Sequence, residues 1–171
     1  KNYIKPDDYL NSVKAFFVMQ DTYKESPDID KFEGAFVSRD VYNMRARNYI
    51  LSRLENFENK APIIIENYTI EHIMPQTLSS AWKKELGDDY QAIYDRWDNR
   101  LANLTLTAYN SSYSNKSFYE KKTAENGFDH SGFRLNDFVK GCDQWTEKEL
   151  IERSELLKQT ALKLWPMPSS N

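Results

Sequence analysis

The chain has 171 residues, of which 40% are hydrophobic, and this length predicts one domain, or one domain with a helical extension. Its single cysteine, Cys142, excludes both an internal disulfide and a zinc site built on several thiolates, which favours a reducing, cytoplasmic compartment. No apolar run approaches the roughly 20 residues that span a membrane, so we expect no membrane association.

The first third of the sequence is predicted to be helical. Apolar residues recur at spacings of three and four over 6–23, which is typical of an amphipathic helix. Ser26-Pro27-Asp28 breaks this pattern, and a short helix through Phe32 and Phe36 follows. A longer helix is expected over 38–57. We expect the apolar stripes of these helices to belong to the core.

The middle of the chain combines short strands and helices. β-branched runs predict strands over 63–65 and 68–73. Helical patterns follow over 80–86 and 89–97. Apolar and polar residues then alternate over 101–107, which predicts a half-buried strand.

The last part is predicted to be helical again. A turn-rich stretch over 110–115 precedes a helix over 116–122, and turn signals predict a loop over 126–132. Thr146 opens a capping-box sequence, which predicts the start of a terminal helix that ends near Trp165. Together these elements predict an α+β chain that is predominantly helical.

Residues 69–76, Thr-Ile-Glu-His-Ile-Met-Pro-Gln, hold one of only two histidines. Glu71 and His72 are sequence neighbours, and on a regular strand their side chains would point to opposite faces. A functional pair therefore requires the strand to end or bend here. Pro75 favours such an ending because it lacks an N–H and fixes φ.

Polar and basic residues gather further along the chain. Asn103 lies in the alternating strand, and Asn110 and Asn115 bound the turn before the lysine-bearing helix. The net charge of −3 argues against a general nucleic-acid binder. From residue 100 to residue 122, however, the sequence contains four basic residues and one acidic residue, which gives a local charge of +3. A local field of this sign can guide a polyanion to the site.

The order of these motifs resembles the ββα-metal core of HNH (His-Me finger) nucleases. A closer resemblance, to the C-terminal nuclease domain of GmrSD-type modification-dependent restriction proteins, rests on Arg100-Leu-Ala-Asn-Leu-Thr-Leu106, on Ser114-Asn115-Lys116, and on Trp145, Arg153 and Trp165. The resemblance implies a ββα-metal core with a short β-hairpin, flanked by N-terminal and C-terminal helices. It predicts a helical extension over 1–58, a nuclease domain over 59–165 and a tail over 166–171. Trp145, Arg153 and Trp165 are expected to dock the terminal helix.

The resemblance implies a metal-dependent DNA endonuclease for phage defence. His72 would activate water as a general base, because imidazole titrates near neutral pH. Asn103 would hold its ring in the required tautomer. Glu71 and Asn110 would bind Mg²⁺ or Mn²⁺, which suit oxygen ligands, and Asn115 is the alternative to Asn110.

Double-stranded DNA is the expected partner, with phosphate contacts from Lys116, Lys121, Lys122 and Arg100. A structural pairing of Arg100 with Asp95 or Asp98 is the alternative for that residue. The resemblance also implies an N-terminal, NTP-dependent, ParB-like module that is not in this chain. Two other functions stay open: a non-catalytic nucleic-acid-binding or regulatory domain that retains the HNH fold, and a helical interaction domain.

Overall fold

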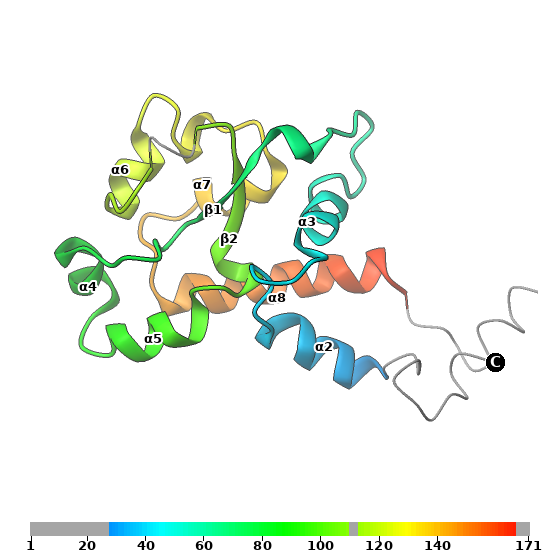
Figure 1. The fold of residues 1–171 in the computed structure, drawn as a ribbon, viewed down its shortest axis with the longest axis horizontal. Coiled ribbons are helices and arrows are strands. Elements are labelled where there is room, and N and C mark those ends of the chain that lie inside the picture. Colours follow the sequence, from blue (N-terminus) through cyan, green and yellow to red (C-terminus); the bar gives the residue numbers. More distant parts are fainter. Residues whose placement is uncertain (1–27, 110–112, 167–171) are drawn as a thin grey trace, which may run out of the picture.

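The computed structural model describes residues 28–109 and 113–166, and its architecture is α+β and mainly helical (Figure 1). The predicted helix over 6–23 lies outside the described residues. In chain order the helices and strands are α2 (Ile29–Ser38), α3 (Arg47–Glu55), β1 (Thr69–His72), α4 (Ser80–Leu86), α5 (Tyr90–Trp97), β2 (Leu104–Thr107), α6 (Phe118–Thr123), α7 (Asp137–Lys140) and α8 (Glu147–Leu164). Short 3₁₀ helices lie at Ile65–Asn67, Leu101–Asn103, Phe128–His130 and Arg134–Asn136.

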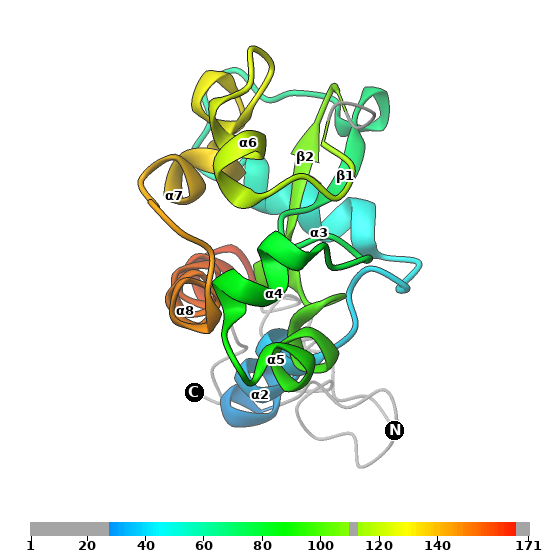
Figure 2. The ribbon, with the colours of Figure 1, turned by 90° about the vertical axis from the view of Figure 1, so that its left-hand side faces the viewer.

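The two strands form a small antiparallel pair at the middle of the molecule (Figure 1). Thr69 pairs with Thr107 at one end of the register and His72 pairs with Leu104 at the other. In Figure 1, α3 and α6 lie on opposite sides of this pair. Seen from the side, α6 and α7 lie above α4 and α5, with α8 beside them (Figure 2). The end of β1 therefore lies where several elements meet.

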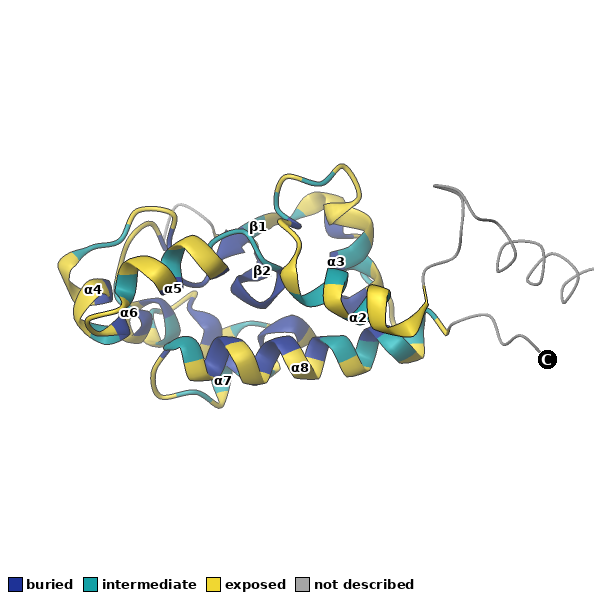
Figure 3. Ribbon diagram, turned by 90° about the horizontal axis from the view of Figure 1, so that it is seen from below, coloured by how far each residue is buried: buried dark blue, intermediate teal, exposed yellow. Residues whose placement is uncertain are grey.

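Strand β2 is more buried than the alternation of its sequence predicts. All four of its residues are buried, so the prediction of a half-buried strand was wrong (Figure 3). The threonine hydroxyls are satisfied inside the protein: Thr105 donates to Asn136, and Thr107 accepts from Tyr109 N at 2.9 Å. Buried polar groups are tolerated where they are hydrogen-bonded.

The predicted helix over 38–57 forms only in its second half, as α3. The reason is tertiary pairing before it: Asp40 forms a β-bridge with Arg100, and both Val41 N and Tyr42 N donate to Asn99 O. The Asp40 carboxylate also accepts from Asn43 N at 3.0 Å, which stabilises a turn in place of a helix.

Among the other predicted elements, one strand does not form and four helices do. The predicted strand over 63–65 does not form; its last residue begins a 3₁₀ helix instead. The predicted helices over 80–86 and 89–97 are confirmed as α4 and α5, and the short helix after Asp28 is confirmed as α2. The helix α6 begins two residues later than predicted, because Ser117 and Glu120 form a capping box there.

Helix α8 joins the two hydrophobic clusters of the core. Its Leu150 belongs to a cluster with Trp82 and Trp145, and its Leu157 belongs to a second cluster with β2. The buried guanidinium of Arg153 donates to Ala102 O, Leu104 O and Leu135 O, which ties α8 to β2. In Figure 3 the buried face of α8 is turned toward the strands. Trp145 and Arg153 therefore dock this helix as predicted, and Trp165 is partly buried against the second cluster.

Within residues 28–109 and 113–166, no helix has the length and apolar character needed to cross a bilayer.

Candidate active site

A cavity of about 600 Å³ opens at the end of β1. Its walls come from β1, from the Pro75–Thr77 segment, from the turn before α6 and from the segment before α3. The lining residues are Tyr42, Ile70, Glu71, His72, Pro75, Gln76, Thr77, Ser114 and Asn115. Strand β1 ends at His72, and the neighbouring residues Glu71 and His72 both line this cavity.

Glu71 forms an ion pair with a buried lysine. Lys121 Nζ lies 2.7 Å from Glu71 Oε1, and it also donates to His72 O at 2.8 Å and Ile73 O at 3.1 Å. Glu71 is 5% exposed and Lys121 is fully buried. Burial raises the pKa of Glu71, and the charge of Lys121 opposes that rise. Burial lowers the pKa of Lys121 in turn, against the influence of Glu71.

The imidazole of His72 is held by groups from two other segments. Its Nε2 lies 3.2 Å from Asn99 Oδ1 and 4.0 Å from Asp98 Oδ1, and its ring meets the Tyr42 ring edge-on at 4.4 Å. An amide oxygen only accepts hydrogen bonds, so this contact places the ring proton on Nε2 and leaves Nδ1 as the basic nitrogen. Burial lowers the pKa of His72, and the hydrogen bond to Asn99 partly offsets that effect. The lowered pKa favours the neutral form of the ring.

Asp98 carries an unsatisfied acceptor beside this ring. Its Oδ1 is buried and has no hydrogen-bond partner among the described residues. Burial, followed by the charge of Asp40, raises the pKa of Asp98 to about 6. The negative charge at this position is therefore poorly solvated.

Asn103 does not contact the His72 ring, which corrects the predicted tautomer role. Its side chain accepts from Met74 N at 2.8 Å and donates to Met74 O at 2.8 Å and Asp98 O at 3.0 Å. The side chain is fully buried against the chain that follows β1. Asn103 therefore holds the backbone at the end of β1, and Asn99 holds the ring.

Of the two candidate amide ligands, Asn110 and Asn115, only Asn115 lies among the described residues. Asn110 lies outside the described residues, and Asn115 lines the cavity together with Glu71 and His72. No group of three or more His, Cys, Asp and Glu side chains in the described ranges could hold a metal ion. The oxygen donors that the cavity does offer, a carboxylate and an amide, suit a hard divalent cation that keeps several waters.

Of the four predicted DNA contacts, only Lys116 is exposed. Lys121 is buried, and its three hydrogen bonds go to the end of β1, so it presents no charge at the surface. Lys122 donates to Cys142 O at 2.7 Å. Arg100 packs its guanidinium over the Trp97 ring at 5.1 Å instead of pairing closely with Asp95 or Asp98.

Sequence reasoning missed two residues of the site. Tyr42 was assigned to the core stripe of a helix, although the chain is not helical there. Asn99 directly precedes the Arg100–Leu106 block, but no spacing connects it to His72. Only pairing of the segment around Tyr42 with Asn99 O brings both side chains to the imidazole.

One family comparison covers most of these residues. A family model described as GmrSD restriction endonucleases, C-terminal domain, matches residues 26–160, a range that contains every described residue lining the cavity. No curated protein matches the chain. The chain therefore belongs to the family of C-terminal domains of GmrSD restriction endonucleases, an HNH-type domain.

Proposed function

We propose that this domain is a metal-dependent DNA endonuclease that cuts one strand by hydrolysis of a phosphodiester bond. The observation that carries the proposal is the cavity at the end of β1, which gathers an imidazole, a carboxylate and an amide in a chain of this restriction endonuclease family. The ββα-metal core would consist of β1, β2 and α6, which come in that order along the chain, with α4 and α5 between the two strands.

His72 acts as the general base in this proposal. Asn99 holds the proton on Nε2, so Nδ1 takes the proton from the attacking water. The lowered pKa of His72 supports this role because it favours the neutral form, which can accept a proton. Asn103 and Lys121 fix the backbone that carries the ring, through Met74 and through His72 O.

Glu71 would hold Mg²⁺ or Mn²⁺ together with Asn110 or Asn115, and the lining of the cavity supports Asn115. A divalent ion bound there supplies positive charge that stabilises the phosphate and the departing 3′ oxygen. Lys121 keeps Glu71 in place from the buried side.

Nicking of supercoiled plasmid tests the proposal. The purified chain is incubated with plasmid and Mg²⁺ or Mn²⁺, beside an EDTA control and the variants His72→Ala and His130→Ala. His130 is exposed and lies away from the cavity, which makes it a matched control. We expect metal-dependent nicking by the wild-type chain and His130→Ala, and none by His72→Ala.

Two results would contradict parts of this proposal. Metal-dependent nicking that survives His72→Ala would overturn the assignment of the base. DNA binding without nicking under any condition would favour a non-catalytic, nucleic-acid-binding or regulatory domain that retains the HNH fold.

We further propose that the domain works in the cytoplasm within a modification-dependent restriction system against phage. An NTP-dependent, ParB-like module would sense DNA modification and control cutting. The family match supports this role, because it is a match to the C-terminal part of restriction endonucleases. A plaque assay with the complete protein and its His72→Ala variant, on phages with modified and unmodified DNA, tests it.

A further inference from the structure

The segment that precedes α3 forms one wall of the candidate active site. Val41 N and Tyr42 N both donate to Asn99 O, at 3.0 and 3.1 Å. The side chain of the same Asn99 contacts His72 Nε2. The segment and the imidazole are therefore fixed to a single residue, and the position of Tyr42 relative to His72 is set by backbone hydrogen bonds.

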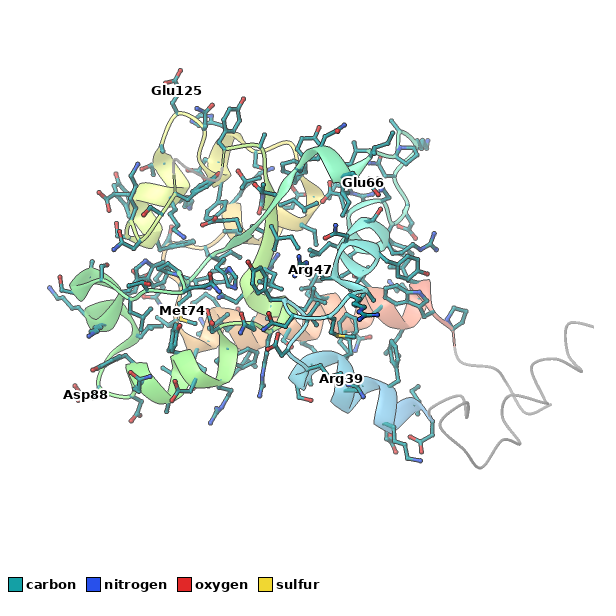
Figure 4. All side chains as sticks on the ribbon, in the orientation of Figure 1. Arg39, Arg47, Glu66, Met74, Asp88 and Glu125 are labelled. Carbon is teal, nitrogen blue, oxygen red and sulfur yellow. The ribbon has the colours of Figure 1, made fainter. Side chains whose placement is uncertain are left out.

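Tyr42, which lines the cavity, in turn contacts an arginine. Arg47, the first residue of α3, donates from Nη1 to Tyr42 O at 2.8 Å, and its guanidinium lies over the Tyr42 ring at 5.4 Å. Figure 4 labels Arg47 at the start of α3. Arg47 is exposed, and none of the salt bridges among described residues involves it. Only one of the five guanidinium N–H donors is used in the bond to Tyr42 O.

The charge around this wall is positive. Residues 39–47, which include Tyr42, contain three arginines, Arg39, Arg45 and Arg47, and one acid, Asp40, which gives a local charge of +2. All three arginines are exposed. Exposed Lys116 follows Asn115, which lines the cavity from the turn before α6, and Arg47 contacts Tyr42, which lines it from the segment before α3.

We propose that Arg47 is a phosphate-binding residue of this site. Tyr42 holds its guanidinium, which contacts a DNA backbone phosphate beside the bond that is cut. This inference rests on the proposed function, since it assigns a substrate contact to the same cavity. A planar guanidinium that is already oriented by a stacked ring pairs well with a phosphate. The segment before α3 is then part of the substrate surface and not only a packing element.

DNA binding in the presence of EDTA tests this contact without cleavage. A fluorescently labelled duplex is titrated with the 171-residue chain and its variants over a range of salt concentrations, and anisotropy gives Kd. We expect Arg47→Ala to raise Kd about tenfold, and to reduce the slope of log K against log salt by roughly one. Arg47→Lys should restore the slope but only part of the affinity, because an ammonium cannot form the same bidentate pair.

Arg53→Ala is the matched control. It removes the same charge from the same helix, six positions further along, where the side chain points in another direction around the helix axis. We expect it to leave Kd and the salt slope unchanged. In plasmid nicking, Arg47→Ala should raise KM and leave kcat close to the wild-type value, which distinguishes a ground-state contact from damage to the base.

The outcomes separate this inference from the proposed function. Wild-type Kd for Arg47→Ala, with nicking still abolished by His72→Ala, overturns the role of Arg47 and leaves the endonuclease in place. An equal effect of Arg47→Ala and Arg53→Ala also overturns it, because the contact would then be a general charge effect. A wild-type chain that neither binds nor nicks DNA overturns both proposals.

Discussion

Lys121 and Glu71 are 50 positions apart in the sequence and form a buried ion pair of 2.7 Å. The same ammonium group donates to His72 O and Ile73 O. All three donor positions of the lysine are therefore used at the end of β1. Helix α6 is joined to β1 at the point where the two candidate catalytic side chains emerge.

Lys121→Met is expected to destabilise the fold by about 3–5 kcal/mol, because it leaves the Glu71 carboxylate buried without its partner. Urea unfolding measures the change. Lys116→Met, at an exposed position, serves as the control and should change the free energy of unfolding by less than about 0.5 kcal/mol. The double variant Glu71→Gln/Lys121→Met should recover part of the loss. No recovery would show that the packing of the lysine, and not the charge pair, matters.

Asn99→Ala is expected to lower the nicking rate by roughly 10- to 100-fold while the chain remains folded, because the His72 ring loses the acceptor that fixes its tautomer. Asn99→Asp should shift the pH–rate profile to higher pH, since a carboxylate raises the pKa of a neighbouring imidazole. A pH series of nicking rates measures both effects. Unchanged rates in Asn99→Ala would exclude this residue from the mechanism.

Asn103→Ala is expected to lower the folding stability of the protein. It leaves Met74 N and Met74 O buried without partners, and each unsatisfied group costs about 1–3 kcal/mol. Thermal unfolding should therefore show a large loss of stability for Asn103→Ala and a small one for Asn99→Ala. The reverse order would contradict the division of roles between the two asparagines.

Asp98→Asn is expected to stabilise the protein at alkaline pH. The folded-state pKa of about 6 lies above the ordinary value of 3.8, so folding disfavours the charged form; the penalty grows as the pH rises above 3.8 and is complete above about pH 6. The penalty disappears below the unfolded-state pKa, where both states are protonated. The variant should therefore be more stable than wild type by up to about 3 kcal/mol near pH 8, and equally stable at about pH 3. Urea unfolding at the two pH values checks this, and a less stable variant near pH 8 would refute it.

Gly127→Ala is expected to destabilise the protein by about 1–3 kcal/mol. A Cβ at this position would lie 2.6 Å from Lys121 O and 2.8 Å from Ala124 O, and nearer still to Lys122 O. These atoms are backbone carbonyls at the end of α6, which cannot move away without displacing Lys121. Gly132→Ala is the matched control, because nothing lies within 4 Å of its Cβ. Differential scanning calorimetry should show a lower Tm for Gly127→Ala only.

Local sequence signals predicted the elements that depend on local physics. The capping box at Thr146 and Glu149 marks the start of α8, and Pro75 marks the end of the Glu71-His72 strand; both are confirmed. The helix predicted over 38–57 failed because the chain around Tyr42 is paired with Asn99, and no local pattern reports that pairing. The same long-range contact explains why Tyr42 and Asn99 were absent from the predicted site.

The sequence by itself determined that Glu71 and His72 lie at a strand end and that the chain resembles HNH nucleases, since short-range motifs carry this information. Only the tertiary structure decided which partners these residues have. The local sequence around Lys121 and Asn99 does not distinguish them from lysines and asparagines at the surface. Burial makes Lys121 an ion-pair partner instead of a DNA contact, and backbone pairing brings Asn99 instead of Asn103 to the imidazole. Such choices depend on which polar groups lose water on folding, and this is set by contacts between residues far apart in the chain.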